Sequence, residues 1–216
     1  MLFETEPPFE TELMDVLPAD LPERERVARK AAEHLRLIEE TNRQFNLTRI
    51  TSPRDAAIKH VLDSVLPWRL FAGVKRVLDA GTGAGFPGIP LALVLPGVKF
   101  TLSESIQKKA RFVEHAVKVL ELGNALVTSR RAEELTAGEE VLTLRAVAPL
   151  IRAVPLFASA IRRGARVLAY KGPDVKQEME DAAEEAKKRK VRMEVVMRYE
   201  LPEGQGGRTI VELKSW

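Results

Sequence analysis

The sequence contains no cysteine, which excludes disulfide bonds and cysteine-ligated zinc sites. It also excludes every reaction that needs a thiolate nucleophile. Histidine is almost as scarce, because only His34, His60 and His115 occur. So few histidines give little material for a metal centre, and we expect no bound metal.

Long apolar segments are also missing, since no run approaches the roughly 18 residues needed to span a bilayer. The first residues, Met1 to Glu6, lack the basic region of a secretory signal. We therefore expect a cytoplasmic protein with no membrane association. The 216 residues, 45% hydrophobic and 30% charged, suit one sizeable core or one core with a small extension.

Basic residues are absent from the first twenty positions, which hold six acids. Pro7, Pro8 and Pro18 fall in the same region, and we predict an acidic irregular arm over residues 1–21. The whole chain has a net charge of +3, so the residues beyond position 20 carry +9. Such a basic body suits an anionic partner such as RNA, although surplus lysine also promotes solubility.

Two helices are predicted before the first strand. The first extends over residues 22–45, with apolar side chains on one stripe. Ser52 is typical of an N-cap, and Pro53 would occupy the first position of a second helix that ends near Phe71. We assign residues 22–72 to an N-terminal helical extension that packs against the domain after it.

A glycine-rich turn follows the first predicted strand, residues 74–80, which is short, apolar and β-branched as a buried parallel strand requires. Residues 81–88 read Gly-Thr-Gly-Ala-Gly-Phe-Pro-Gly, so the backbone turns tightly and exposes its N–H groups. A helix over 89–95 and a strand over 98–102 come next, and Glu104 stands just beyond that strand. A carboxylate beside such a turn accepts hydrogen bonds from ribose hydroxyls, and we predict a nucleoside-cofactor site.

The glycine pattern leaves an NAD-type cofactor open as an alternative. Gly83-x-Gly85-x-x-Gly88 matches the dinucleotide fingerprint. Pro87 and Pro90 count against this interpretation, because they remove backbone N–H donors that a pyrophosphate would use.

A second fingerprint fits the same turn better. Asp79-x-Gly81-x-Gly83-x-Gly85 places an acid at the strand end before three alternating glycines. This pattern resembles motif I of the Rossmann-like S-adenosylmethionine methyltransferases. The resemblance implies that Asp79 faces the amino-acid end of the cofactor and that Glu104 takes the ribose.

The rest of the chain alternates strands with helices. We predict strands over 125–128, 141–145, 166–170, 191–199 and 209–213, and helices over 106–122, 149–161 and 174–190. Such alternation implies a mostly parallel sheet with ligands bound past the carboxyl ends of the strands. With the resemblance, we expect an α/β, Rossmann-like class I methyltransferase fold after the N-terminal helices. Its seven-stranded sheet would be mostly parallel with an antiparallel C-terminal strand, and residues 73–216 would form this S-adenosylmethionine-binding domain.

Short motifs run in order along the chain from about Asn42. They are Asn46-Leu47-Thr48, Lys59-His60-x-x-Asp63-Ser64, Asp79-x-Gly81-Thr82-Gly83-x-Gly85-Phe86-Pro87-Gly88-Ile89-Pro90, Glu104-Ser105-x-x-Lys108-Lys109, Arg131-Ala132-Glu133, Arg145-Ala146 and Lys171-Gly172. On these motifs the chain resembles the RsmG (GidB) methyltransferases, which methylate N7 of a guanine in bacterial small-subunit (16S) ribosomal RNA. Glu104 stands where that family often has aspartate. The resemblance implies S-adenosyl-L-methionine as cofactor, and 16S rRNA, the small ribosomal subunit or its precursor as partner of a monomeric enzyme.

The resemblance also implies a set of cofactor contacts around the strand ends. They are Asp79, Gly81, Gly83, Gly85, Phe86, Glu104, Ser105, Ala132, Glu133 and Arg145. Glu133 is alternatively a plain acid at a helix start. Arg145 is alternatively a partner in a salt bridge to Asp79 or another core acid.

His60, Arg131 and Lys171 are candidates for holding RNA. Arginine and lysine bind phosphates without reading sequence, so specificity would come from the shape of the rRNA. Packing between helices is the more common role for a histidine such as His60. No catalytic residue is assigned, because N7 of guanine presents an in-plane lone pair and needs no general base.

Two other functions remain open at this point. One is methylation of a small molecule on the same scaffold, since a fold does not fix a substrate. The other is a non-catalytic RNA-binding or NAD-dependent protein with a Rossmann-like fold. The motifs outside the glycine turn count against the first. The sequence Arg-Ala-Val-Ala-Pro at 145–149, where an Asn/Asp-Pro-Pro-Tyr signature would stand, counts against methylation of an exocyclic amine.

Overall fold

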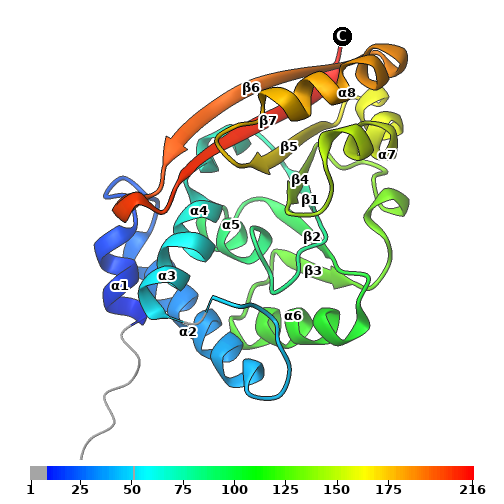
Figure 1. The fold of residues 1–216 in the computed structure, drawn as a ribbon. Helices are drawn as coiled ribbons and strands as arrows, with labels where there is room; N and C mark the ends of the chain where they lie inside the picture. The colour runs from blue at the N-terminus through cyan, green and yellow to red at the C-terminus, as the bar shows by residue number, and fades with distance from the viewer. Residues whose placement is uncertain (1–8, 51) are drawn as a thin grey trace, which may run out of the picture.

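The computed structural model describes residues 9–50 and 52–216 (Figure 1). At its centre lies a seven-stranded sheet in the order β3-β2-β1-β4-β5-β7-β6. The first five strands pair in parallel, and β7 is antiparallel to both of its neighbours. The strands are β1 (Arg76–Ala80), β2 (Lys99–Ser103), β3 (Ala125–Thr128), β4 (Val141–Arg145), β5 (Arg166–Lys171), β6 (Val191–Glu200) and β7 (Gly207–Ser215). The predicted α/β fold, with its mostly parallel sheet and antiparallel C-terminal strand, is confirmed.

Helices cover both faces of the sheet. Successive residues of each strand point to opposite faces, so each strand contributes side chains to two buried clusters. On β1, Val77 joins a buried cluster that includes residues of α2, α5 and α6, whereas Leu78 joins a cluster with α7 and α8. These helices are α2 (Arg24–Asn42), α5 (Gly88–Val94), α6 (Gln107–Val119), α7 (Leu150–Arg162) and α8 (Lys176–Arg189). Among the described residues, no helix combines the length and apolar character needed to cross a bilayer.

The predicted irregular arm over residues 1–21 is wrong for residues 9–16, which form helix α1 (Phe9–Val16). Phe9, Leu13 and Leu17 lie four residues apart and are no more than 3% exposed, so one apolar stripe packs into the core of the extension and the sheet. The acids around this stripe hid it in the sequence, yet acidic residues in a first turn favour a helix. The part of the prediction that covers residues 1–8 lies outside the described residues.

The second predicted helix is divided into short segments instead of one helix that ends near Phe71. They are α3 (Pro53–Ala56), the π-helix η1 (Ala57–Leu62), α4 (Asp63–Val65) and the 3-10 helix η2 (Trp68–Phe71). Ser52 caps α3 as predicted, since its Oγ accepts a hydrogen bond from the backbone N–H of Asp55 at 3.2 Å. π-helices are rare and are frequently found at functional sites.

The C-terminal hairpin of β6 and β7 reaches back to the N-terminal helices (Figure 1). Arg54 of α3 donates two hydrogen bonds, at 2.8 and 2.6 Å, to Glu203 at the tip of the hairpin. Gln205, at the same tip, donates one to Asp55 at 2.9 Å. Leu201 of the same tip packs in a small cluster with η1. We call these four polar residues and Leu201 the hairpin–helix contact. It joins the N-terminal extension to the C-terminal hairpin beside the carboxyl edge of the parallel strands.

Candidate functional site

The glycine turn wraps tightly around the end of β1. Gly81, Gly83 and Gly85 have φ values of +67°, +63° and +98°, in the left-handed region that favours glycine. The N–H of Thr82 donates to the carbonyl of Ser103 at 3.0 Å, which ties the turn to the end of β2. The turn therefore lies at the carboxyl edge of the sheet, where parallel sheets bind ligands.

Asp79 supports this turn from below. Its side chain is fully buried, and its two oxygens accept hydrogen bonds from the N–H of Gly88 at 2.9 Å and from Thr143 Oγ1 at 2.8 Å. Burial raises the pKa of Asp79, and those two hydrogen bonds lower it in part. Both oxygens bind the chain itself, so the structure places Asp79 behind the turn and not in the space in front of it.

Two adjoining hollows lie in front of the strand ends. The inner hollow is lined among others by Thr48, His60, Gly81, Gly83, Phe86, Glu104, Lys109 and Arg145. The outer hollow is lined among others by Gly81, Ser105, Arg131, Ala132, Glu133, Arg152 and Leu156. Gly81 and Val147 line both, so the two hollows meet at the turn.

The floor of this space is bare main chain. A Cβ built on Gly81 would lie 2.9 Å from Cγ2 of Val147, and one on Gly83 would have no atom closer than 4.0 Å. Gly81 thus has no room for a side chain, whereas a side chain on Gly83 would fill open space. Glycine at both positions lets a ligand lie directly against the backbone.

Glu104 braces the turn from the end of β2. It is 6% exposed, and its Oε2 accepts a hydrogen bond from the N–H of Gly83 at 3.1 Å. Its Oε1 accepts from the N–H of Ile106 at 2.8 Å. Each carboxylate oxygen has a second lone pair, so Glu104 retains capacity for the hydroxyls of a ribose.

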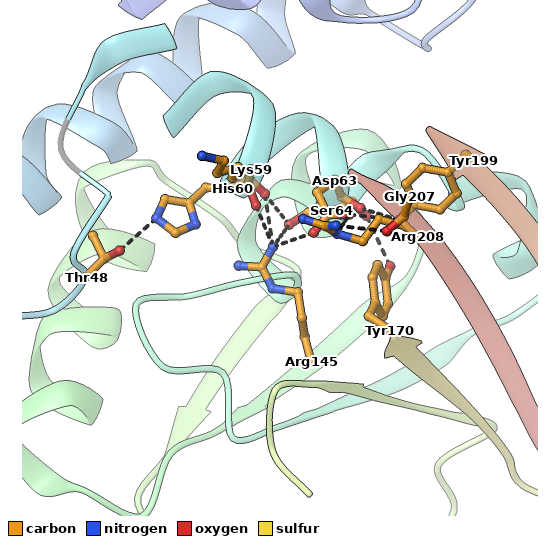
Figure 2. A network of polar contacts seen from close by, with 10 residues as sticks. All are labelled: Thr48, Lys59, His60, Asp63, Ser64, Arg145, Tyr170, Tyr199, Gly207 and Arg208. Atoms are coloured by element: carbon orange, nitrogen blue, oxygen red, sulfur yellow. Dashed lines mark hydrogen bonds and ion pairs between the residues drawn. The ribbon is translucent and has the colours of Figure 1, made fainter. Parts of the chain in front are cut away.

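Arg145, the last residue of β4, is anchored by one nitrogen (Figure 2). Its Nη1 donates to the carbonyls of Lys59 and His60 at 3.2 and 3.4 Å and to Ser64 Oγ at 3.3 Å. The same Nη1 lies 3.5 Å from Oδ2 of Asp63. Burial lowers the pKa of Arg145, and the charge of Asp63 opposes this effect. The core acid that pairs with Arg145 is therefore Asp63 and not Asp79. Nε and Nη2 form no hydrogen bond with any described residue.

His60 and Phe86 form an aromatic pair on the wall of the inner hollow. Nε2 of His60 is hydrogen-bonded to Thr48 Oγ1 at 2.9 Å (Figure 2), and the side chain is 8% exposed. Burial lowers the pKa of His60 to about 3, with help from the positive charge of Arg145. A neutral, packed imidazole fits the helix-packing role, although it also faces the hollow.

The outer hollow contains the other predicted cofactor contacts. Ala132 and Glu133 begin the 3-10 helix η3 (Ala132–Glu134), so Glu133 is both a helix-start acid and a lining residue. Arg131 precedes them with its side chain 73% exposed, and its Nη1 lies 3.8 Å from Oε1 of Glu133. Ser105, just beyond β2, is exposed and lines the same hollow.

Lys171 lines neither hollow. Its Nζ donates to Oε1 of Glu178 at 2.6 Å and to the carbonyl of Ala148 at 2.9 Å. The same glutamate oxygen accepts from the N–H of Leu150 at 2.7 Å. Lys171 therefore holds the connection between β4 and α7 in place. In this it differs from Arg131, the other basic residue among the predicted RNA contacts, whose side chain is exposed.

Sequence reasoning gave no role to several lining residues, among them Thr48, Lys109 and Arg152. Thr48 and Lys109 stood in motifs of the resemblance but received no role. Arg152 lies in the first turn of α7, where no motif marks it. Only the folding of α7 over the outer hollow brings that guanidinium to the rim.

A sheet in this strand order, with a glycine turn after β1 and an acid after β2, has the Rossmann-like architecture of the S-adenosylmethionine-dependent methyltransferases. The bare main chain at Gly81 and Gly83, the carboxylate of Glu104 and the unpaired nitrogens of Arg145 fit this cofactor. The chain belongs to the GidB family, described as rRNA small subunit methyltransferase G, whose model matches residues 27–205.

Individual relatives agree with this assignment. A ribosomal RNA small subunit methyltransferase G from Solibacter usitatus is 61% identical over 208 residues, which cover 95% of this chain and 99% of the relative. A protein of the same name from Carboxydothermus hydrogenoformans is 36% identical over 190 residues, which cover 84% and 80%. The solved structure of an S-adenosylmethionine-dependent O-methyltransferase from Thermotoga maritima matches with a TM-score of 0.54 and 17% identity, over 83% of this chain and 71% of that one. The last match concerns the fold alone. The family decides between the two cofactor fingerprints in favour of S-adenosylmethionine.

Proposed function

We propose that this methyltransferase modifies N7 of a guanine in small-subunit ribosomal RNA. The observation that carries the proposal is the character of the ionisable groups that line the inner hollow. Glu104 already accepts a backbone N–H on each oxygen, and the pKa of His60 is about 3. With that pKa, His60 is too weak a base to take a proton from a substrate, and the oxygens of Glu104 are already engaged with the backbone. Guanine N7 needs no such removal, because its lone pair already lies in the plane of the base.

The cofactor, when bound, supplies a methyl group on a positively charged sulfur. We assign its amino-acid end to the backbone of Gly81 and Gly83 and to Arg145, whose planar guanidinium suits a carboxylate. Glu104 would accept the ribose hydroxyls, and the backbone of Ala132 with Glu133 would meet the adenine in the outer hollow. Phe86 and Ser105 would line the same cofactor site, and Asp79 and Gly85 would hold the turn behind it. In this scheme the chain contributes mainly by placing N7 and the methyl group in line.

The rim of the hollows suits a polyanion. Arg131 and Arg152 are exposed beside the outer hollow, and Lys109 lies at the inner one. Such side chains bind phosphates in any sequence, so the shape of the rRNA would select the target. Ribosomal RNA as substrate also accounts for the cytoplasmic location that we propose.

The test is to incubate the chain with small ribosomal subunits and S-adenosylmethionine labelled in the methyl group. Digestion of the rRNA should then yield labelled 7-methylguanosine from one position. A matched reaction with subunits that already carry the modification should incorporate no label. Label on adenine, on a pyrimidine or on ribosomal protein would overturn the proposal.

A further inference from the structure

Asp63 is the centre of a buried polar network that no step of the proposed function uses (Figure 2). The residue begins α4 and is 5% exposed. Its Oδ1 accepts a hydrogen bond from the hydroxyl of Tyr199 at 2.9 Å and lies 3.4 Å from Nε of Arg208. Its Oδ2 lies 3.5 Å from Nη1 of Arg145. One carboxylate therefore faces the C-terminal hairpin with one oxygen and the active site with the other.

The contacts of Arg145 show why this carboxylate matters. The four contacts of its Nη1 are 3.2 to 3.5 Å long, at or beyond the upper end of the normal range for an N–H···O hydrogen bond. The two carbonyls and the hydroxyl around it are neutral acceptors, so none of them compensates a buried positive charge. Asp63 supplies the only full negative charge among these partners, and a buried guanidinium without such a partner would be costly.

The hairpin holds Asp63 in turn. Tyr199 of β6 and Arg208 of β7 both contact its Oδ1, and the adjacent Ser64 accepts a hydrogen bond on its carbonyl from the hydroxyl of Tyr170 at 3.1 Å. α4 is thus fixed against strands β5, β6 and β7. Because Tyr199 and Arg208 fix the carboxylate of Asp63, that carboxylate in turn restricts the orientation of the Arg145 guanidinium.

We propose that Asp63 is a positioning residue that aims the unpaired nitrogens of Arg145 at the carboxylate of the cofactor. This inference rests on the proposed function, in which Arg145 binds that carboxylate. Asp63 itself does not line either hollow, so it acts through Arg145 alone. A substitution at Asp63 should then affect only ligands that carry the amino-acid part of the cofactor.

Two ligands separate this role from a general effect on the fold. S-adenosylhomocysteine carries the carboxylate, whereas 5′-methylthioadenosine retains the adenosine and the sulfur without the amino-acid part. Asp63→Asn keeps the size of the side chain and an oxygen for Tyr199 but removes the charge. Calorimetry should show about tenfold weaker binding of S-adenosylhomocysteine, the size of a lost charged hydrogen bond, and unchanged binding of 5′-methylthioadenosine.

Three further variants complete the test. Arg145→Met should give the same selective loss, and adding Asp63→Asn to it should weaken S-adenosylhomocysteine no further. Tyr199→Phe, which keeps the packing, should give a smaller loss for the same ligand, and it serves if Asp63→Asn does not fold. Arg54→Ala is the matched control, because it breaks the hairpin–helix contact without touching Asp63 or Arg145. Its affinities for both ligands should equal those of the unsubstituted chain.

The outcomes are distinct. Equal losses for both ligands in Asp63→Asn, or a loss in Arg145→Met without one in Asp63→Asn, would overturn the positioning role while leaving the proposed function intact. Failure of the unsubstituted chain to bind S-adenosylhomocysteine would overturn the proposed function, and this inference with it.

Discussion

The imidazole of His60 lies flat on the ring of Phe86, with ring centroids 4.6 Å apart and planes inclined by 11°. His34 lies 4.9 Å from the same Phe86 ring, measured between centroids, and donates through Nε2 to the carbonyl of Ala84 at 2.8 Å. The glycine turn is therefore held against α2 and η1 by two imidazoles. Both must stay neutral to remain buried.

This packing predicts acid sensitivity of the fold. The pKa is about 4 for His34 and about 3 for His60, against about 6.5 in an unfolded chain. Below about pH 6.5 the unfolded chain takes up protons that the folded chain excludes, so stability falls with pH until about pH 4 for His34 and about pH 3 for His60. Each imidazole contributes up to about 1.4 kcal/mol per pH unit.

Urea unfolding between pH 5 and pH 8 measures this slope. His34→Gln keeps a hydrogen-bond donor but cannot titrate, so the slope below pH 6.5 should decrease by about one proton equivalent. An unchanged slope in His34→Gln would show that His34 is not excluded from protonation in the folded chain.

The absence of room at Gly81 predicts loss of cofactor binding in Gly81→Ala. Alanine at φ +67° is strained by roughly 1–2 kcal/mol, and its Cβ would meet Val147 at 2.9 Å. Gly73→Ala is the control, because φ there is +76° and nothing lies within 4 Å of the added Cβ. Both variants should lose stability through the strained φ, Gly81→Ala somewhat more because its Cβ also meets Val147, but only Gly81→Ala should lose affinity for S-adenosylhomocysteine. Equal affinity in the two variants would contradict the placement of the ligand against Gly81.

Helix α1 should behave as part of the core. Phe9→Ala is expected to lower the free energy of unfolding by about 3–5 kcal/mol, because the phenyl ring is 2% exposed and would leave a cavity. Glu10→Ala, on the exposed side of the same helix, should change it by less than about 0.5 kcal/mol. Chemical denaturation of the two variants checks this. Similar free energies of unfolding for both would contradict the packing of residues 9–16 into the core.

Arg131 and Lys171 should separate into different roles. Arg131→Ala should weaken rRNA binding and reduce the salt dependence by about one counterion, as loss of one phosphate contact does. Lys171→Ala should leave that salt dependence unchanged and lower stability instead, since the variant removes the charged partner of Glu178 and the donor to the carbonyl of Ala148. Filter binding at several salt concentrations and urea unfolding distinguish the two. The assignment fails if Lys171→Ala shows the larger change in salt dependence.

The parts of the site that were predicted correctly depend on local chemistry. The strand before the glycine turn, the three glycines with positive φ and Glu104 beyond β2 all follow from short-range rules of backbone geometry. The cap at Ser52 belongs to the same class. Such features were readable because each depends on residues within a few positions of one another.

The errors have a common cause as well. The apolar stripe of α1 was hidden because hydrophobic residues in an acidic segment gain their stability only when another surface covers them. The π-helix η1 could not be foreseen, since the contacts of its carbonyls with Arg145 come from a strand more than eighty positions away. The contact of Lys171 with Glu178 could not be foreseen either, because a lysine in sequence does not reveal whether a glutamate lies beside it.

By itself the sequence determined the α/β fold, a site for a nucleoside cofactor and the position of the turn that receives it. Periodicity, glycine and an acid at a strand end act within one stretch of chain, so their consequences are fixed before the chain folds. Only the tertiary structure decided that Asp63 pairs with Arg145, that Asp79 lies behind the turn, and that two neutral imidazoles enclose Phe86. These relationships join residues far apart in sequence, and burial, which sets their charge states, exists only once the core has formed.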